Sequence, residues 1–90
     1  MKLEKADVVI SLNGRDKGKR FLIIDTEDEY SFLVDGKTRR LEKPKRKKNK
    51  HVKPDGTIGE HLSAKLMAGD KITNSEIRRA LAERAQSSED

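Results

Sequence analysis

The sequence predicts an α+β fold in which a small β-barrel of about five strands precedes a short C-terminal helical hairpin. In residues 6–12 and 30–34 apolar side chains recur at every second position, which is the period of a strand. Turn-forming pairs, of which Asp35-Gly36 is the clearest, interrupt this pattern. After residue 57 the apolar spacing lengthens to about four, the period of a helix. We therefore expect the barrel in residues 1–55 and a helical segment in residues 56–90.

Three strands are expected in the first part of the chain, over residues 6–12, 19–26 and 30–34. The second of them is apolar on both faces from Phe21 to Ile24, as expected of a central barrel strand. Asp35-Gly36 predicts a type I′ hairpin, after which residues 37–42 return as a fourth strand. His51-Val52 is expected to form a short closing strand before the turn residues 54–56.

Two charged segments are expected to lie outside the sheet. An acidic turn separates the second and third strands, and its residue order matches no calcium loop, so we interpret it as a solvated hairpin tip. Its members are Asp25, Glu27, Asp28 and Glu29. Residues 45–50, KRKKNK, follow Pro44 and contain five cations in six positions. Because such cations repel one another, we expect this segment in solvent or against an anion.

Two helices are expected in the last third of the chain. The first covers residues 57–69, with Thr57 as its N-cap and Gly69 just beyond its end. The second covers residues 74–86 and follows a capping box formed by Thr73 and Glu76. Its apolar face consists of Ile77, Ala80, Leu81 and Ala85. The polar residues 86–90 are expected to fray.

The strongest chemical signal is a basic run from Lys37 to Lys53. This run holds ten Lys or Arg residues and one carboxylate, Glu42, for a net charge of +9. The whole chain carries +5, so the remaining residues are acidic on balance. Such asymmetry predicts a strongly cationic surface and a polyanionic partner, most often nucleic acid. A solvated flexible loop is the alternative interpretation.

Composition and motifs argue against several classes of function. Without cysteine the chain forms neither a disulfide framework nor a thiolate zinc site, and His51 and His61 are isolated from other ligands. The sequence contains no Ser/His/Asp constellation and no P-loop. We therefore expect no catalysis, no cofactor and no bound metal. No apolar run is long enough to span a bilayer, which favours a cytoplasmic protein without a membrane partner, monomeric when free.

The loop of residues 13–19, NGRDKGK, is the second candidate contact region. Gly14 and Gly18 permit close backbone approach and are expected to leave N–H groups directed outward. Three flanking cations add charge that suits the phosphates of RNA. The alternative is that the two glycines serve only the geometry of the turn.

This loop and its flanking strands, VVISLNGRDKGKRFLIIDTEDEYSFLVDG, resemble the KOW motif of ribosomal proteins and transcription elongation factors. The segment VDGKTRRLEKPKRKKNKHV resembles the part that follows the KOW unit in an archaeal and eukaryotic large-subunit ribosomal protein family. Short bacterial KOW-domain RNA-binding proteins end in a similar helical segment, so the likeness covers residues 5–82. The resemblance implies an SH3-like barrel that binds structured RNA, usually ribosomal RNA.

The expected function is therefore non-catalytic binding of structured RNA, above all ribosomal RNA, in translation or ribosome assembly, with ribosomal proteins as further partners. Aromatic residues are few, which favours contact with phosphates over stacking on bases. One alternative is an adaptor that docks on ribosomal or polymerase components through the helix face around Ile77 and Leu81. A DNA-binding architectural protein is another alternative. The predicted contact residues are Arg15, Lys17, Gly18, Lys19, Lys37, Arg39, Arg40, Lys43, Lys45, Arg46, Lys47, Lys48, Lys50 and His51.

Overall fold

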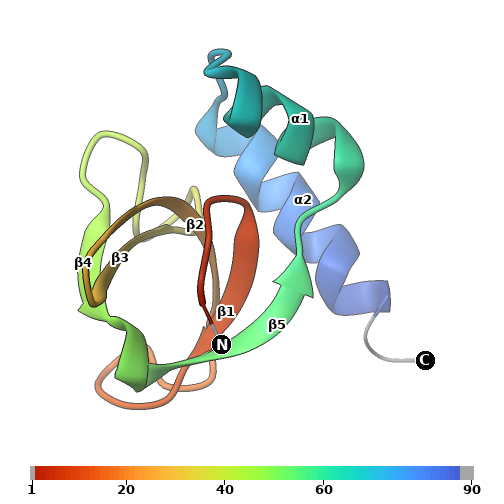
Figure 1. Ribbon diagram of the computed structural model, residues 1–90. Helices are drawn as coiled ribbons and strands as arrows, with labels where there is room; N and C mark the ends of the chain where they lie inside the picture. Colours follow the sequence, from red (N-terminus) through yellow and green to blue (C-terminus); the bar gives the residue numbers. More distant parts are fainter. Residues whose placement is uncertain (1, 88–90) are drawn as a thin grey trace.

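Five strands, a short 3-10 turn and two helices follow one another along residues 2–87, the part of the chain that the computed structural model describes (Figure 1). The strands are β1 (Asp7–Ser11), β2 (Arg20–Glu27), β3 (Tyr30–Val34), β4 (Lys45–Lys48) and β5 (Val52–Thr57). The turn η1 (Asn49–His51) joins β4 to β5, and the helices are α1 (Glu60–Ala68) and α2 (Asn74–Ser87). The predicted α+β class, with strands first and helices after them, is confirmed.

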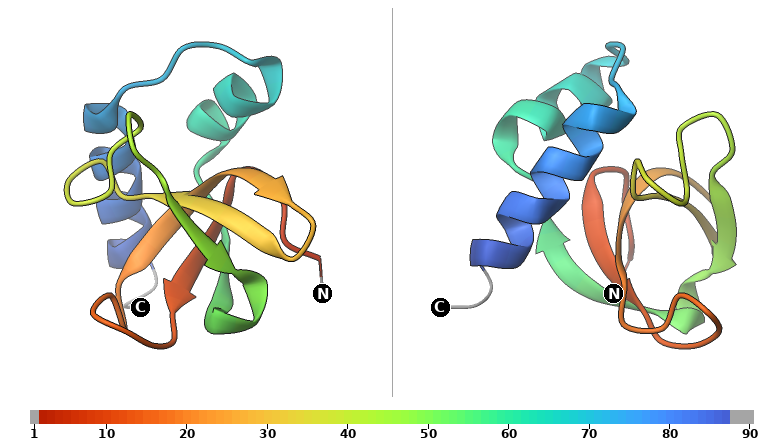
Figure 2. Two further views of the ribbon diagram at one scale, coloured as in Figure 1. Left: turned by 90° about the vertical axis from the view of Figure 1, so that its left-hand side faces the viewer. Right: turned by 180° about the vertical axis from the view of Figure 1, so that it is seen from behind.

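All five strands form one antiparallel sheet in the order β4-β3-β2-β1-β5. The sheet curls strongly, so its two edge strands come together where η1 joins them, and both helices lie outside the curl (Figures 1 and 2). The edge strands β4 and β5 form no ladder with each other. The sheet is therefore open and not closed into the expected barrel.

Strand β2 separates two apolar clusters, one on each of its faces. Phe21 and Ile23 are buried in the inner cluster, within the curl of the sheet. Leu22 is buried in the outer cluster, which the two helices cover. The inner cluster contains Leu3, Val9, Phe21, Ile23, Leu33 and Val52, and the outer cluster contains Ala6, Val8, Leu22, Val34, Ile58, Leu62, Leu66, Ile77 and Leu81. The predicted burial of β2 on both faces is confirmed.

The predicted fourth strand over residues 37–42 is wrong, because a wide loop connects β3 to β4. The Asp35 carboxylate accepts the backbone N–H groups of Lys37, Thr38 and Arg39 at 2.9, 2.9 and 2.7 Å, which turns the chain instead of extending it. The Thr38 hydroxyl also donates to Asp35, at 2.7 Å. Partial burial raises the pKa of Asp35, but these hydrogen bonds outweigh it and hold the pKa below 3.8.

The fourth strand of the sheet is β4, which lies inside the basic segment expected in solvent. In the ladder between β3 and β4, Lys45 lies opposite Leu33 and Lys48 lies opposite Tyr30. Lysine-rich edge strands are common because their charge hinders pairing with another chain. The cations of β4 therefore alternate between two faces of an ordered strand.

The junction between β5 and α1 also differs from the prediction. Residues 54–56, predicted to turn, lie within β5, which is bulged and still pairs Thr57 with Asp7. Because Thr57 is a strand residue, α1 begins only at Glu60, and Gly59 occupies its N-cap without a side-chain hydrogen bond. Gly69 adopts a left-handed φ of 75° just beyond α1, as predicted.

Helix α2 begins as the sequence predicts. Thr73 N–H donates to Glu76 Oε1 at 3.0 Å, and Glu76 N–H donates to Thr73 Oγ1 at 3.1 Å, so the capping box is confirmed. The helix continues through Ser87, and the expected fraying of the tail concerns residues that lie largely outside the described part. Within residues 2–87, no helix is long and apolar enough to cross a membrane.

Two arginines fasten α2 to the sheet and its loops. Arg78 Nη1 donates to the carbonyl oxygen of Gly36, and Arg84 donates from Nε and Nη2 to the carbonyl oxygen of Asp55 at 3.0 and 2.7 Å. The apolar face of α2 lies between these anchors, and Ile77 is fully buried there. The face proposed for an adaptor is therefore covered by the protein's own sheet.

Candidate nucleic-acid interface

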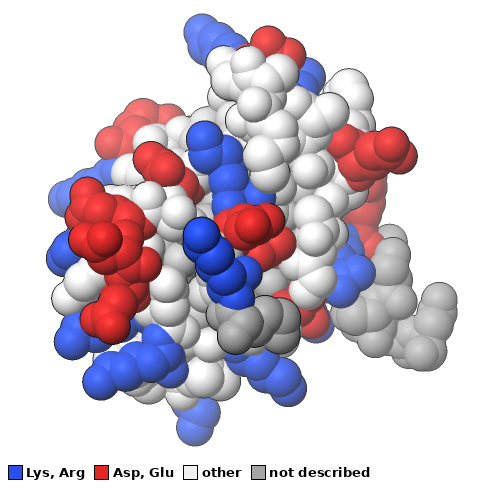
Figure 3. Space-filling model, viewed as in Figure 1, with Lys and Arg blue, Asp and Glu red and all other residues white. Residues whose placement is uncertain are grey.

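The two basic segments of the sequence meet at one end of the curled sheet. Leu12 N–H donates to the His51 carbonyl oxygen at 2.9 Å, which places the β1–β2 loop beside η1. The loop and η1 lie together at the lower end of the molecule in Figures 1 and 2, where Lys and Arg side chains gather in Figure 3. We call this surface the basic end, and it consists of Arg15, Lys17, Lys19, Lys48, Lys50 and Lys53.

The glycines of the β1–β2 loop serve its backbone conformation. Gly14 and Gly18 have φ of 76° and 86°, and a Cβ at either position would meet nothing within 4 Å. The N–H groups of Lys17, Gly18 and Lys19 donate to carbonyl oxygens inside the loop or on Ser11, at 3.2, 2.8 and 2.9 Å. These three N–H groups do not point outward as expected, because each donates to a carbonyl oxygen of the protein.

Two arginines of the β3–β4 loop form ion pairs within the protein. Arg39 Nη2 lies 3.4 Å from Asp16 Oδ2, and the Asp16 side chain is largely buried. The Nε of Arg39 is buried without a hydrogen-bond acceptor in the described part of the chain. Arg40 Nε lies 3.2 Å from Glu42 Oε2. Of the two, Arg39 joins this loop to the β1–β2 loop.

The four cations of β4 also differ in their surroundings. The guanidinium carbon of Arg46 lies 3.6 Å from the centroid of the Tyr30 ring, and its Nη2 is 3.7 Å from Glu27 Oε1. Lys47 is half-buried and donates from Nζ to Ser11 Oγ at 2.6 Å. Lys45 is half-buried on the same side of the strand as Lys47. Of the four, Lys48 is the exposed cation with no ion pair among the described residues.

Lys37 and Lys43 are the remaining predicted contact residues of the β3–β4 loop, and both are exposed. Leu41 N–H donates to Asn74 Oδ1 at 2.8 Å, so the loop packs on the first turn of α2. Most of this loop lies away from η1 in Figure 2, although Arg39 brings it within 3.4 Å of Asp16 in the β1–β2 loop. We therefore do not include Lys37 and Lys43 in the basic end. His51, by contrast, is half-buried within η1 beside it.

Acidic residues border the basic end on one side. A shallow pocket of about 310 Å³ is lined by Asp28, Glu29, Lys48, Asn49 and Lys50. Asn49 N–H donates to the Glu29 carbonyl oxygen at 2.7 Å. Asp28 and Glu29 form an exposed turn, as predicted. Asp25 and Glu27, predicted to lie in the same turn, are exposed residues of β2 and pair with β3. The carboxylates of the turn reduce the positive potential near Lys48 and Lys50. In the β1–β2 loop, Lys19 Nζ lies 3.8 Å from Asp16 Oδ1, and Arg15 and Lys17 are exposed.

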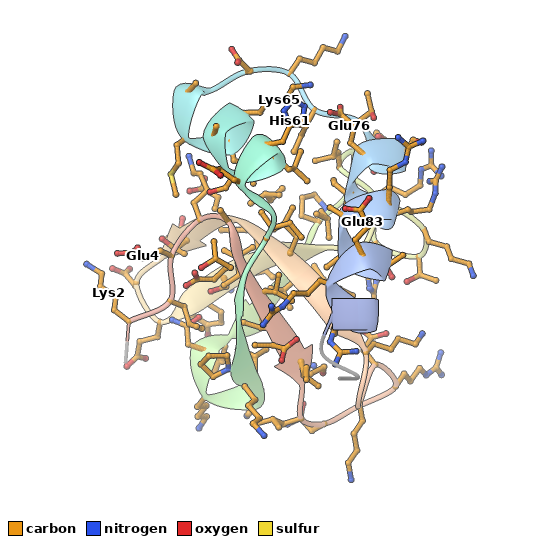
Figure 4. The ribbon with its side chains drawn as sticks, turned by 90° about the vertical axis from the view of Figure 1, so that its right-hand side faces the viewer. Lys2, Glu4, His61, Lys65, Glu76 and Glu83 are labelled. Atoms are coloured by element: carbon orange, nitrogen blue, oxygen red, sulfur yellow. The ribbon has the colours of Figure 1, made fainter. Side chains whose placement is uncertain are left out.

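A second hollow lies between the helices. This cleft, of about 530 Å³, is lined by His61 from α1 and by Glu76 and Glu83 from α2 (Figure 4). Lys65 Nζ donates to Glu76 Oε2 at 2.8 Å, and this bond holds the pKa of Glu76 below its usual 4.5. Among the described residues no group of three or more His, Cys, Asp or Glu is arranged to hold a metal ion.

Several polar residues at the basic end carry no sequence signal. Ser11 is buried in β1 and Ser31 is buried in β3, with β2 between them in the sheet, and Asn49 is half-buried in η1. Their importance follows only from the curl of the sheet, which brings them to the same end of the inner cluster. Comparison with known protein families and with curated proteins finds no match to this chain.

Proposed function

We propose that the protein is a non-catalytic RNA-binding module whose basic end grips the phosphate backbone of structured RNA. The single observation that carries this proposal is the hydrogen bond between Leu12 and His51, which joins two basic segments separated in sequence into one surface. Exposed lysines and arginines without buried partners bind phosphates by releasing counterions. The resemblance of the chain to KOW proteins makes ribosomal RNA the first candidate, in a cytoplasmic role in translation or ribosome assembly.

An SH3-like arrangement of strands, which the KOW resemblance implies, is part of the same proposal, although the sheet is open between β4 and β5. Its support is a five-stranded antiparallel sheet curled around one apolar cluster, with the edge strands joined by the three-residue turn η1. Such a frame leaves the β1–β2 loop and η1 at one end, free of the helices (Figure 1).

Folded RNA is favoured over unstructured single strands because the basic end offers no platform for base stacking. Phe21 is buried, Phe32 is half-buried, and the Arg46 guanidinium covers the ring of Tyr30. Proteins that bind single strands without sequence preference use exposed aromatic rings for successive bases. Contacts to phosphates held at fixed positions by a folded RNA suit a surface of lysines and arginines.

A pair of triple variants with equal charge tests the proposal. The first variant removes three cations from the basic end and combines Lys17→Ala, Lys50→Ala and Lys53→Ala. The second variant removes three exposed cations elsewhere and combines Lys37→Ala, Lys43→Ala and Lys71→Ala. Affinity for a structured ribosomal RNA fragment is measured by fluorescence anisotropy across a salt series. We expect the first variant to flatten the slope of log affinity against log salt by about two to three units, and the second by less than about one.

Three results would count against the proposal. Equal losses in the two variants would mean that net charge alone attracts RNA. No binding by the parent protein at any salt concentration would remove the proposed function. Tighter binding to duplex DNA than to folded RNA of the same length would favour the architectural alternative.

A further inference from the structure

Polar side chains close the inner apolar cluster at the basic end. Ser11 and Ser31 are buried, with 1% and 0% of their surface exposed. Lys47 Nζ donates to Ser11 Oγ at 2.6 Å, and Ser31 Oγ donates to Asn49 Oδ1 at 2.6 Å. We call Ser11, Ser31, Lys47 and Asn49 the polar layer. Two of its four members belong to the basic run, although both of them contact the protein's own side chains.

Lys47 crosses the curl of the sheet to reach Ser11. Two strands, β3 and β2, separate β4 from β1 in the sheet order. The side chain spans this separation because the sheet curls and Lys47 lies on its inner side, opposite the buried Ser31 in the β3–β4 ladder. The contact therefore connects an edge strand to the start of the β1–β2 loop.

Ser11 in turn fixes both ends of that loop. Its hydroxyl donates to the Asn13 carbonyl oxygen at 3.1 Å, and Lys47 Nζ donates to the same oxygen at 3.2 Å. The backbone of Ser11 donates to the Lys19 carbonyl oxygen at 3.0 Å and accepts from Gly18 N–H at 2.8 Å. Every one of these bonds acts on the segment that carries Arg15 and Lys17, whose side chains are exposed.

Asn49 holds η1 in place through hydrogen bonds to the strand β3 and to the turn before it. Its side chain accepts from Ser31, and its backbone N–H donates to the Glu29 carbonyl oxygen at 2.7 Å. Lys50 is the next residue and is exposed. The polar layer thus holds the β1–β2 loop on one side and η1 on the other, at a fixed separation.

We propose that Lys47 and Ser11 are positioning residues that set the spacing of the RNA-binding cations without touching RNA themselves. This inference rests on the proposed function. A loop held in its bound conformation avoids the entropic cost of ordering on binding, so losing the contact weakens affinity. A cation that contacts phosphate also contributes to the salt slope, whereas a positioning residue contributes to affinity and leaves the slope unchanged.

Ser11→Ala tests this role without changing charge. Because Ser11 is buried, its hydroxyl is not available to RNA. The variant removes the acceptor for Lys47 and the hydroxyl's own bond to the Asn13 carbonyl oxygen. We expect affinity for a structured ribosomal RNA fragment to fall by roughly three- to tenfold, the equivalent of one hydrogen bond, with the salt slope unchanged. Ser63→Ala on α1 is the matched control, since Ser63 is half-buried and distant from the polar layer. Its affinity should equal that of the parent protein.

A pair of lysine variants separates positioning from contact. Lys47→Met and Lys50→Met each remove one cation and keep a long side chain. We expect Lys50→Met to flatten the salt slope by about 0.7 to 0.9 units and Lys47→Met to lower affinity with less than half that change in slope. Hydrogen exchange of the Gly18 and Lys19 amides in the free protein should accelerate in Lys47→Met and in Ser11→Ala but not in Lys50→Met.

The outcomes distinguish this inference from the proposed function. If the parent protein binds RNA and Ser11→Ala binds equally well, the positioning role is refuted and RNA binding stands. If Lys47→Met flattens the slope as much as Lys50→Met does, Lys47 contacts RNA directly and the inference is likewise wrong. If the parent protein binds no RNA, the proposed function and this inference both fail, even where faster exchange shows that the contact orders the loop. All affinities are compared at a temperature at which circular dichroism shows each variant to be folded.

Discussion

Replacing Gly36 by alanine should destabilise the protein through a collision between a loop and a helix. Gly36 has a φ of 76°, and a Cβ built on it would lie 2.3 Å from the Asn74 carbonyl oxygen and 3.1 Å from Arg78 Cγ. The carbonyl oxygen belongs to the first residue of α2 and cannot move without shifting the helix. Gly36 also accepts the Arg78 hydrogen bond through its own carbonyl oxygen. The substitution therefore strains the contact between the β3–β4 loop and α2.

The size of the effect has two parts. A left-handed backbone costs a residue with a side chain about 1–2 kcal/mol, and reduced freedom of the unfolded chain offsets about 0.4–1 kcal/mol of this. Overpacking against a backbone atom adds about 1–3 kcal/mol. We expect Gly36→Ala to lower the free energy of unfolding by about 1–4.5 kcal/mol in total. For a domain of this length each kcal/mol lowers Tm by about 4–8 °C.

Gly14→Ala is the matched control, because Gly14 has the same φ of 76° and a Cβ there would lie in open space. Both variants are unfolded with urea and followed by circular dichroism, and the midpoints are compared at equal m-values. We expect Gly36→Ala to cost at least about 1 kcal/mol more than Gly14→Ala, since only the former adds overpacking. Equal losses would show that α2 does not pack on the β3–β4 loop as described, and would refute the reasoning.

Three further predictions follow from single contacts. Arg46→Ala should lower the free energy of unfolding by about 0.5–1 kcal/mol because it loses the contact with Tyr30. Lys48→Ala, which removes the same charge from the same strand, should change the free energy of unfolding by less than about 0.5 kcal/mol. Thermal melts of the two variants test this, and equal midpoints would contradict it. The pKa of Asp35 lies below 3.8 in the folded protein, so its contribution to stability should be complete above that pH and be lost as the pH falls through the lowered pKa. Urea midpoints measured from pH 6 to pH 2 should therefore fall less steeply in Asp35→Asn than in the parent, and parallel curves would contradict the assignment. Thr73→Ala should cost about 1 kcal/mol by removing the N-cap of α2, while Thr57→Ala, at the predicted but unused cap, should cost less in a urea titration.

Local patterns in the sequence determined much of this fold. The strands at β1, β2 and β3 follow from the alternation of apolar residues, and the capping box at Thr73 follows from two side chains three residues apart. Gly69 ends α1 as predicted because a left-handed residue is needed there whatever surrounds it. In each case the interaction that decides the structure is made between residues close together in the chain, so the sequence contains it in readable form.

The tertiary structure alone decided where the fourth strand lies and which cations remain free. Asp35-Gly36 predicts a tight hairpin. Instead, the Asp35 carboxylate accepts hydrogen bonds from the next residues and a wide loop follows β3. The strand that pairs with β3 is β4, in the basic segment further along the chain. Arg39 donates a hydrogen bond to Asp16, which lies 23 residues away in the sequence. Lys47 donates one to Ser11, which lies 36 residues away. Coulomb attraction and hydrogen bonding depend on distance in space. The curl of the sheet sets those distances. It therefore determines which cations form contacts within the protein, as Arg39 and Lys47 do, and which remain exposed for a partner.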